Sequence, residues 1–216
     1  MASDDDSLVH FGVLERVQVP DDNSCLFRSV INCLGGPTHA PVRTVPELRA
    51  LVAAKIGAEP DVYSEAVLGK PNRTYQTWIT GENAWGGAIE LSIFASVFQI
   101  EFAAVDVKTL RIYRYGEDAS YAQRAFLIYD GIHYDSVALR LIGSAPSDPL
   151  ITQFPASDAL AVDKVRELAR EFNRRGEYTD TAGFTLKCAD CGARLVGEKQ
   201  AVQHAQATGH ANFTES

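Results

Sequence analysis

The first candidate for chemistry is Cys25, which stands between a polar, turn-prone run and an apolar pattern of helical period. Residues 20–24 (Pro-Asp-Asp-Asn-Ser) precede it, and apolar residues at helical spacing follow as far as Leu34, before Gly35-Gly36-Pro37 ends the pattern. We therefore expect Cys25 in the first turn of a helix whose other face is buried. The N–H groups and the positive dipole end of such a turn favour a thiolate and could bind an oxyanion. Cys25 is thus a candidate nucleophile, the alternative being a small buried thiol.

A cysteine nucleophile needs a base, and the chain has five histidines. His10 lies near the N-terminus and His39 in a proline-containing loop, whereas His204 and His210 have the spacing of metal ligands. The histidine that remains is His133, which follows a segment with the composition of a buried strand. We therefore expect His133 to act as the base.

Asp135 is the candidate that orients this base. His133 and Asp135 are two residues apart, so on an extended segment their side chains point to the same side. Asp135 can then accept a hydrogen bond from one imidazole nitrogen while the other nitrogen faces the thiol. With Cys25, this makes a nucleophile, a base and an orienting carboxylate. The alternative, a structural histidine, leaves the pairing with Asp135 and the early cysteine unexplained.

The C-terminal region contains a metal-binding pattern. Cys188, Cys191, His204 and His210 follow the spacing Cys-x2-Cys-x12-His-x5-His, which is typical of a tetrahedral zinc site. Four protein ligands leave no open position, so we expect a structural zinc ion and no cofactor for catalysis. The predicted helix over residues 200–207 lacks arginine, so the finger is expected to bind protein or to position ubiquitin rather than to read DNA.

Elements that could position these residues follow from the hydrophobic periodicity. Amphipathic patterns come first and extended patterns follow from residue 100, without regular alternation, which indicates an α+β fold. A sheet must bring Cys25 and His133 together, as papain-like folds do. Helices are expected over 25–34, 44–56, 61–68, 74–79, 88–98 and 158–175, and strands over 100–107, 110–115, 124–129 and 132–139.

Proline, glycine and charge divide the chain into five parts. We expect a flexible acidic N-terminus over residues 1–16 and a catalytic domain over 17–142. Residues 143–157 contain three prolines with little periodicity and are predicted to be a linker. A connecting helix over 158–183 and a zinc finger over 184–216 complete the prediction.

The composition limits the classes of function. The 216 residues are 46% hydrophobic and 22% charged, with a formal net charge of −8, which argues against nucleic acid as the main partner. No apolar run is long enough to cross a membrane, no secretory signal is apparent, and four cysteines do not make a disulfide framework. We expect a cytoplasmic protein that is also nuclear.

Three motifs, at residues 22–27, 85–91 and 127–135, resemble those of the ovarian-tumour (OTU) family of cysteine deubiquitinases. The resemblance extends from about Val17 to Phe213 and is strongest to the ubiquitin thioesterase branch with a C-terminal zinc finger. Most members have Asp-Gly-Asn-Cys where this chain has Asp-Asn-Ser-Cys, a variant typical of that branch.

The resemblance implies a papain-like OTU fold and a thiol-dependent ubiquitinyl hydrolase. Such an enzyme cleaves isopeptide, thioester or peptide bonds at the C-terminal glycine of ubiquitin. It also implies that Asp22 belongs to the site, where on physical grounds we expect it to shape the loop before Cys25. The channel for the ubiquitin tail is expected to include Trp85, Gly86, Asp130 and Ile132. For Trp85-Gly86 the alternative is close helix packing, and for Asp130 it is closure of a turn.

The implied partners are ubiquitin and ubiquitinated proteins, in protein quality control or ER-associated degradation. Better-known members of this branch carry a ubiquitin-like domain that docks on a hexameric AAA segregase, for which the roughly 16 residues before the resemblance are too few. A segregase therefore remains an expected partner without that docking domain, and the chain is expected to be a monomer. The alternative function is a catalytically silent adaptor that binds ubiquitin through the OTU scaffold and the finger. Intact Cys25, His133 and Asp135 argue against it.

Overall fold

The structure is a computed structural model that describes residues 7–35, 44–180, 185–196, 200, 203–204, 207–210 and 213–215. The predicted loop containing His39 and the acidic residues 1–6 lie outside the described residues.

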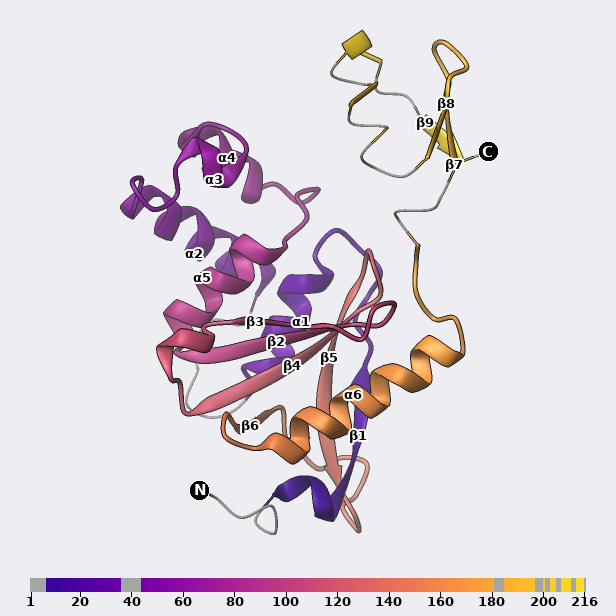
Figure 1. Cartoon of the computed structure of the whole chain (residues 1–216). Coiled ribbons are helices and arrows are strands. Elements are labelled where there is room, and N and C mark those ends of the chain that lie inside the picture. Colours follow the sequence, from indigo (N-terminus) through magenta and orange to yellow (C-terminus); the bar gives the residue numbers. More distant parts are fainter. Residues whose placement is uncertain are drawn as a thin grey trace.

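A six-stranded sheet forms the centre of the larger domain (Figure 1). Its main path has the order β1-β5-β4-β2-β3, and β6 pairs with β4. The pairing of β2 with β4 is parallel and the other pairings in this sheet are antiparallel. The predicted mixed α+β fold is therefore confirmed. The strands are β1 (Gly12–Val17), β2 (Ile100–Asp106), β3 (Ile112–Tyr115), β4 (Gln123–Tyr129), β5 (Tyr134–Leu141) and β6 (Gln153–Pro155).

The helices agree closely with the sequence patterns. The second begins with the predicted capping box, in which Thr44 and Glu47 satisfy each other's backbone N–H groups. The helices are α1 (Cys25–Cys33), α2 (Val45–Ala58), α3 (Glu65–Leu68), α4 (Asn72–Ile79), α5 (Ala88–Phe98) and α6 (Ala159–Arg174), with short 3-10 turns η2 (Leu8–Phe11) and η4 (Glu117–Ala119).

The two faces of the sheet pack against different helices. Along β2, Phe102 and Ala104 belong to a core shared with α1, α2, α4 and α5. The alternating residues Ala103 and Val105 belong to a second core with α6. Figure 1 shows α6 crossing one side of the sheet while α1 and α5 lie on the other. The sheet is thus covered on both faces, and the helix that bears Cys25 is held on one of them.

Three predicted domain boundaries need correction. Residues 12–16 are not a flexible N-terminus, because β1 pairs with β5 along its whole length. The predicted linker 143–157 is part of the domain, since it contains β6 and Gln153 donates a hydrogen bond to the Cys33 carbonyl at 2.9 Å. The predicted connecting helix, α6, is also part of the larger domain, because its residues Val165 and Ala169 are fully buried in the second core. The larger domain therefore extends from residue 7 to about residue 180.

The turn between β4 and β5 is fixed by the chain that follows α6. The Thr179 N–H donates to the Asp130 carbonyl at 2.7 Å. Gly131 has φ +113°, and a Cβ on it would lie 2.3 Å from the Thr179 carbonyl oxygen. Only glycine fits this backbone, so the segment after α6 helps to place His133.

The C-terminal module contains a separate three-stranded antiparallel sheet of order β8-β7-β9. Its strands are β7 (Thr185–Cys188), β8 (Arg194–Val196) and β9 (Phe213–Glu215). Among the described residues, none of the helices has the length and apolar character needed to cross a membrane.

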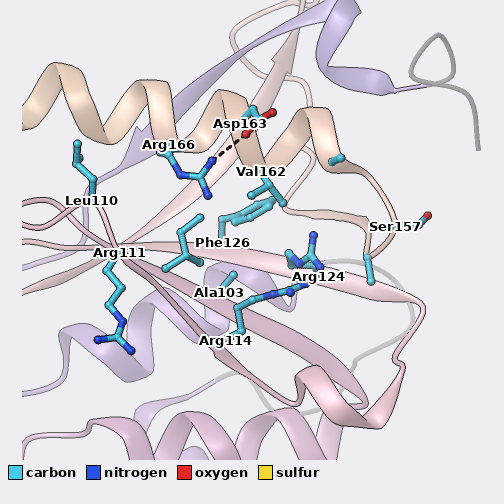
Figure 2. Close-up of a pocket in the computed structure, with 13 residues that line it drawn as sticks. Ala103, Leu110, Arg111, Arg114, Arg124, Phe126, Ser157, Val162, Asp163 and Arg166 are labelled. Atoms are coloured by element: carbon cyan, nitrogen blue, oxygen red, sulfur yellow. Dashed lines mark hydrogen bonds and ion pairs between the residues drawn. The ribbon is translucent and has the colours of Figure 1, made fainter.

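A buried ion cluster lies on the α6 side of the sheet. Glu101 accepts hydrogen bonds from Arg124 and Arg114, both 2.7 Å from its Oε1, and Arg124 is 3% exposed. Both arginines line the pocket of about 540 Å³ in Figure 2, which contains none of the predicted site residues. Burial would raise the pKa of Glu101, but the two arginines outweigh it and lower that pKa.

We predict that Glu101→Ala destabilises the protein by about 3–5 kcal/mol, because it leaves the Arg124 charge buried without its partner. Urea unfolding measures this loss. Since the folded pKa of Glu101 is lowered, its contribution exists above the unfolded pKa of about 4.3 and disappears as the pH falls through the lowered value.

The matched control is Glu117→Ala, which removes an exposed partner of Arg114 and should change stability by less than about 0.5 kcal/mol. Equal stability of the two variants would contradict the importance assigned to the buried pair.

Candidate functional site

Cys25 opens α1 and is half-buried, as the sequence predicted. It lies in a cavity of about 130 Å³ between the start of α1, the loop before α5 and the start of β5. The lining residues are Asp21, Asp22, Asn23, Cys25, Trp85, Gly86, Ile132 and Tyr134. Three of the four residues predicted to form the tail channel are therefore at this cavity, together with the cysteine.

The protonation of Cys25 differs from the prediction. Burial raises the pKa of the thiol, whereas hydrogen bonds from the backbone N–H groups of Tyr134 and Leu26 lower it, and the charges of Asp22 and Asp135 raise it further. The net direction is upward, so the helix N-terminus alone does not produce a thiolate. A base must therefore remove the thiol proton.

His133 and Asp135 form the predicted pair. His133 lies immediately before β5, and its Nε2 is 3.1 Å from Oδ1 of Asp135. The carboxylate is 6% exposed, and the same oxygen accepts the N–H of Val19 at 2.9 Å. Arg16 Nε is 3.8 Å from its other oxygen. Asp135 thus fixes the imidazole and, through Val19, the chain that leads into the loop before Cys25.

The second ring nitrogen of His133 is placed to accept a proton. Nδ1 is buried and has no hydrogen-bond partner among the described residues, the nearest carboxylate oxygen being Asp21 Oδ1 at 3.6 Å. With Nε2 donating to Asp135, Nδ1 is the unprotonated nitrogen of the neutral ring. The Tyr134 N–H bonds to the Cys25 sulfur, so the thiol lies beside the residue that follows His133.

Two side-chain hydrogen bonds hold α1 against β5 near this point. Ser29 Oγ donates to the Tyr134 carbonyl at 2.9 Å, and Asn32 Nδ2 donates to Ser136 Oγ at 3.2 Å. Ser29 and Ser136 are fully buried, so these contacts are shielded from water. They bring together two segments that are about 100 residues apart in the sequence.

Asp22 shapes the loop before Cys25, as expected on physical grounds. Its Oδ1 accepts the Ser24 N–H at 2.8 Å, and its Oδ2 accepts Arg28 Nε at 2.9 Å. The slight burial of Asp22 raises its pKa, but the hydrogen bonds from Arg28 and Ser24 lower it overall. Asp22 is therefore a charged loop-forming residue rather than a proton carrier.

The predicted oxyanion site is not preformed in this loop. Three of the four backbone N–H groups of residues 22–25 already donate within it: Asp22 to Pro20 O at 2.9 Å, Ser24 to Asp22 Oδ1, and Cys25 to Asp22 O at 3.3 Å. The last bond is the longest, so the Cys25 N–H is the most readily released.

Trp85 and Gly86 fit both of the roles considered from the sequence, which are close packing against a helix and a place in the wall of the tail channel. A Cβ on Gly86 would lie 3.0 Å from Leu26 and 3.1 Å from the Phe27 ring, so this glycine allows close packing against α1. Trp85 is 57% exposed at the cavity, and its indole N–H donates to Asn23 Oδ1 at 2.7 Å. The loop is both tightly packed and part of the cavity wall.

Asp130 is placed for turn closure. Its Oδ1 accepts the N–H groups of Ile132 at 3.0 Å and His133 at 2.8 Å, and Asp130 is absent from the cavity lining. This geometry supports the turn interpretation for Asp130, whereas Ile132 lines the cavity and is 40% exposed.

Two residues at the site were missed in the sequence. Asn23 lies inside a recognised motif but received no role, and it contacts both Trp85 and Asn83. Arg49 on α2 is buried and donates to the Asn23 carbonyl at 3.0 Å. An arginine in an amphipathic helix gives no local signal that it will be buried.

The four predicted metal ligands meet in the C-terminal module. The ligand atoms of Cys188, Cys191, His204 and His210 all lie within 4.8 Å of one another. The sulfur–nitrogen distances are 3.7 Å for Cys188–His210 and 3.5 Å for Cys191–His204. A tetrahedral zinc ion with Zn–S of about 2.3 Å and Zn–N of about 2.0–2.1 Å requires roughly 3.6 Å. The residues therefore fit zinc.

Comparisons with known proteins agree with this geometry. The sequence model described as "OTU-like cysteine protease" matches residues 20–137, and the one described as "Ubiquitin thioesterase OTU1, C-terminal C2H2-type zinc finger" matches residues 182–216. A solved "Structure of Ovarian Tumor (OTU) domain in complex with Ubiquitin" superposes with a TM-score of 0.68 at 27% identity, covering 78% of this chain and 91% of that one.

Two curated relatives illustrate the range of lengths. The human "Ubiquitin thioesterase OTU1" is 46% identical over 203 residues, which are 94% of this chain but 58% of that protein. The Arabidopsis thaliana "OVARIAN TUMOR DOMAIN-containing deubiquitinating enzyme 2" is 42% identical over 208 residues, covering 94% of this chain and 98% of that protein. Since the protease model alone matches more than half of the chain, the chain belongs to the OTU family of cysteine proteases, in the branch with a C-terminal C2H2 zinc finger.

Proposed function

We propose that the protein is a deubiquitinase that uses Cys25 to hydrolyse isopeptide, thioester or peptide bonds at the C-terminal glycine of ubiquitin. The observation that carries the proposal is the hydrogen-bonded His133–Asp135 pair, whose neighbour Tyr134 donates its backbone N–H to the half-buried Cys25 sulfur in a small cavity. Family membership, the relatives called ubiquitin thioesterases and the similar fold solved in complex with ubiquitin support it.

The proposed reaction assigns one role to each of these residues. The Cys25 sulfur attacks the carbonyl carbon of the terminal glycine while His133 Nδ1 takes the thiol proton. His133 then gives this proton to the leaving lysine amine, and a thioester joins ubiquitin to Cys25. His133 then deprotonates a water molecule, which attacks the thioester carbonyl. The S–C bond breaks, the Cys25 sulfur takes the proton back from His133, and ubiquitin leaves with a free C-terminal carboxylate. Throughout, Asp135 accepts the Nε2–H and stabilises the imidazolium that forms.

The small cavity suits a tail without side chains. Gly86 adds no side chain to its wall, while Trp85 and Ile132 supply exposed apolar surface. The ubiquitin C-terminus ends in two glycines, which can pass through such a space to reach Cys25. Larger residues at these two positions would be excluded.

The Cys2His2 cluster would hold a structural Zn²⁺ ion. Zinc would fix the C-terminal module, since four protein ligands leave no position for water, and it takes no part in the proposed hydrolysis. Cys188 is fully buried and ends β7, so the ion would tie the small sheet to the segment that carries His204 and His210.

We also propose that the protein acts in quality control, including ER-associated degradation, in the cytoplasm and nucleus, with a AAA segregase as partner. The resemblance to the zinc-finger branch supports this assignment. Co-purification of the chain with the segregase, with a finger-deleted chain as control, tests it.

The alternative is a silent adaptor that binds ubiquitin without cleaving bonds. Incubation with ubiquitin that carries a C-terminal electrophile separates the two functions. The enzyme gives a covalent adduct at Cys25, identified by peptide mass spectrometry, whereas an adaptor binds ubiquitin and gives none.

We predict that Cys25→Ser lowers the hydrolysis of a ubiquitin–fluorophore conjugate by several orders of magnitude and changes ubiquitin affinity by no more than a few-fold. Cys33→Ser is the matched control, since that thiol is fully buried, away from the cavity, with its pKa raised to about 12. Turnover above about one per cent of wild type in Cys25→Ser would refute the assignment of the nucleophile.

His133→Ala should be nearly as damaging as Cys25→Ser, and Asp135→Ala milder, because a base that has lost its orienting partner can still act. In His133→Ala the thiol should be alkylated by iodoacetamide only above the ordinary cysteine pKa of about 8.5, since burial raises the pKa of Cys25. Rapid alkylation of this variant at pH 6 would show that the helix N-terminus ionises the thiol unaided.

Chelation of zinc, or Cys188→Ser, should unfold residues 184–213 and leave the larger domain folded, because a structural ion supplies folding free energy to its own module. Hydrogen exchange followed by mass spectrometry measures the two regions separately. Complete loss of cleavage of the minimal ubiquitin–fluorophore substrate after chelation would show that the finger is part of the active site.

A further inference from the structure

Arg49 on α2 is a buried cation whose hydrogen bonds reach the segment before Cys25, the end of α4 and the segment after it. Its side chain is 2% exposed overall. NH1 donates to the Ile79 carbonyl at 2.9 Å, and NH2 lies 3.0 Å from both the Asn23 carbonyl and Ser24 Oγ and 3.4 Å from the Glu82 carbonyl. One guanidinium therefore joins the segment before Cys25 to the segment after α4.

The planar shape of the guanidinium makes this connection specific. Its carbon lies 4.2 Å from the centroid of the Phe27 ring, so the plane is held against the first turn of α1. The five N–H donors of arginine have a fixed geometry, which a lysine ammonium cannot reproduce. Arg49 thus sets the distance between several backbone groups rather than only supplying charge.

The burial of Arg49 is costly. Its Nε is buried and has no hydrogen-bond partner among the described residues. Desolvation lowers the pKa of Arg49, although the charges of Asp22, Glu90 and Glu82 oppose this. An apolar residue would fill such a place without an unsatisfied donor, and buried ions often contribute less stability than apolar replacements. This cost suggests a role other than stability.

The connection continues to the cavity wall. We call residues 20–25 the Cys25 loop and residues 80–87 the Trp85 loop. Asn23, whose carbonyl accepts from Arg49, accepts the Trp85 indole N–H at 2.7 Å through its side chain and donates to Asn83 at 3.1 Å. Arg49 therefore connects the two loops through their backbone carbonyls, and Asn23 connects them through its side chain. Cys25 and Trp85, one from each loop, both line the cavity.

We infer that Arg49 is a positioning residue for catalysis: its guanidinium holds the Cys25 loop against the Trp85 loop and so fixes the nucleophile and the wall of the cavity. It does not touch the substrate. The expected effect on kcat rests on the proposed function. The link between the two loops does not, because it can be measured without ubiquitin.

The kinetic experiment compares Arg49→Lys with Arg124→Lys on a ubiquitin–fluorophore substrate, corrected for the folded fraction. Arg124 is a matched control, because it is 3% exposed and hydrogen-bonded but belongs to the ion cluster on the α6 side of the sheet. We expect kcat to fall about ten-fold or more in Arg49→Lys, with KM changed by less than about three-fold, and both constants to be unchanged in Arg124→Lys.

The second readout is the fluorescence of Trp85 without substrate. The chain has two tryptophans, so a Trp78→Phe background leaves Trp85 as the only tryptophan, which is excited selectively at long ultraviolet wavelength. In this background Arg49→Lys should shift the emission to longer wavelength and increase acrylamide quenching about two-fold, whereas Arg124→Lys should change neither. If the wild-type chain fails to react with ubiquitin electrophiles, the proposed function falls, but this measurement still tests the link.

Wild-type kcat and Trp85 emission in folded Arg49→Lys would overturn the inference. Equal losses in Arg124→Lys would do the same, since they would indicate general loosening of the core. If Arg49→Lys does not fold, Arg49→Met replaces it, because methionine keeps a flexible apolar side chain at this buried position and removes the guanidinium. Wild-type kcat and unchanged Trp85 quenching in folded Arg49→Met would then overturn the inference, and a two-fold increase in quenching would support it.

Discussion

The arrangement of the site depends on one buried carboxylate. Asp135 accepts hydrogen bonds from His133 Nε2 and from the Val19 N–H with the same oxygen. The first bond selects the orientation and tautomer of the imidazole. The second ties β5 to the chain leaving β1, and therefore to the loop that ends at Cys25. Because β1 pairs with β5 along its length, the distance between these two attachments is set by the sheet. A single side chain thus couples the geometry of the base to that of the nucleophile.

The charges and the burial around Cys25 act on the pKa of its thiol. Burial raises the pKa of the Cys25 thiol, and the charges of Asp22 and Asp135 raise it further. Backbone hydrogen bonds at the start of α1 do not reverse this direction, so in the proposed mechanism the thiol proton passes to His133. In the proposed mechanism the Cys25 thiolate therefore forms only when the His133 ring is correctly oriented to accept the proton. This requirement also explains why an orienting network of Asp135, Asp22, Asn23 and Arg49 surrounds a cavity of only about 130 Å³.

The sequence predicted the elements with strong periodicity and the residues with strong chemical signatures. Helices α1, α2, α5 and α6 and strands β2, β4 and β5 lie close to their predicted ranges. β1 was missed because Glu15 and Arg16 interrupt its apolar pattern, and their pairing with Arg140 and Glu177 is visible only in three dimensions. β6 was missed because it is only three residues long, ends in Pro155 and lies in a proline-containing segment that has the composition of a linker. The role of Arg49, and the packing of Val165 and Ala169 of α6 against the sheet, depend on which elements lie next to each other, and local sequence patterns do not contain this information.

The tautomer of His133 can be determined from the ¹⁵N chemical shifts of its ring in the ubiquitin-free protein at a pH where the ring is neutral. We expect a proton on Nε2, donated to Asp135, and none on Nδ1, which is then free to accept the proton of Cys25. A neutral ring protonated on Nδ1 would refute the proposed proton transfer, because the nitrogen assigned to it would already be occupied.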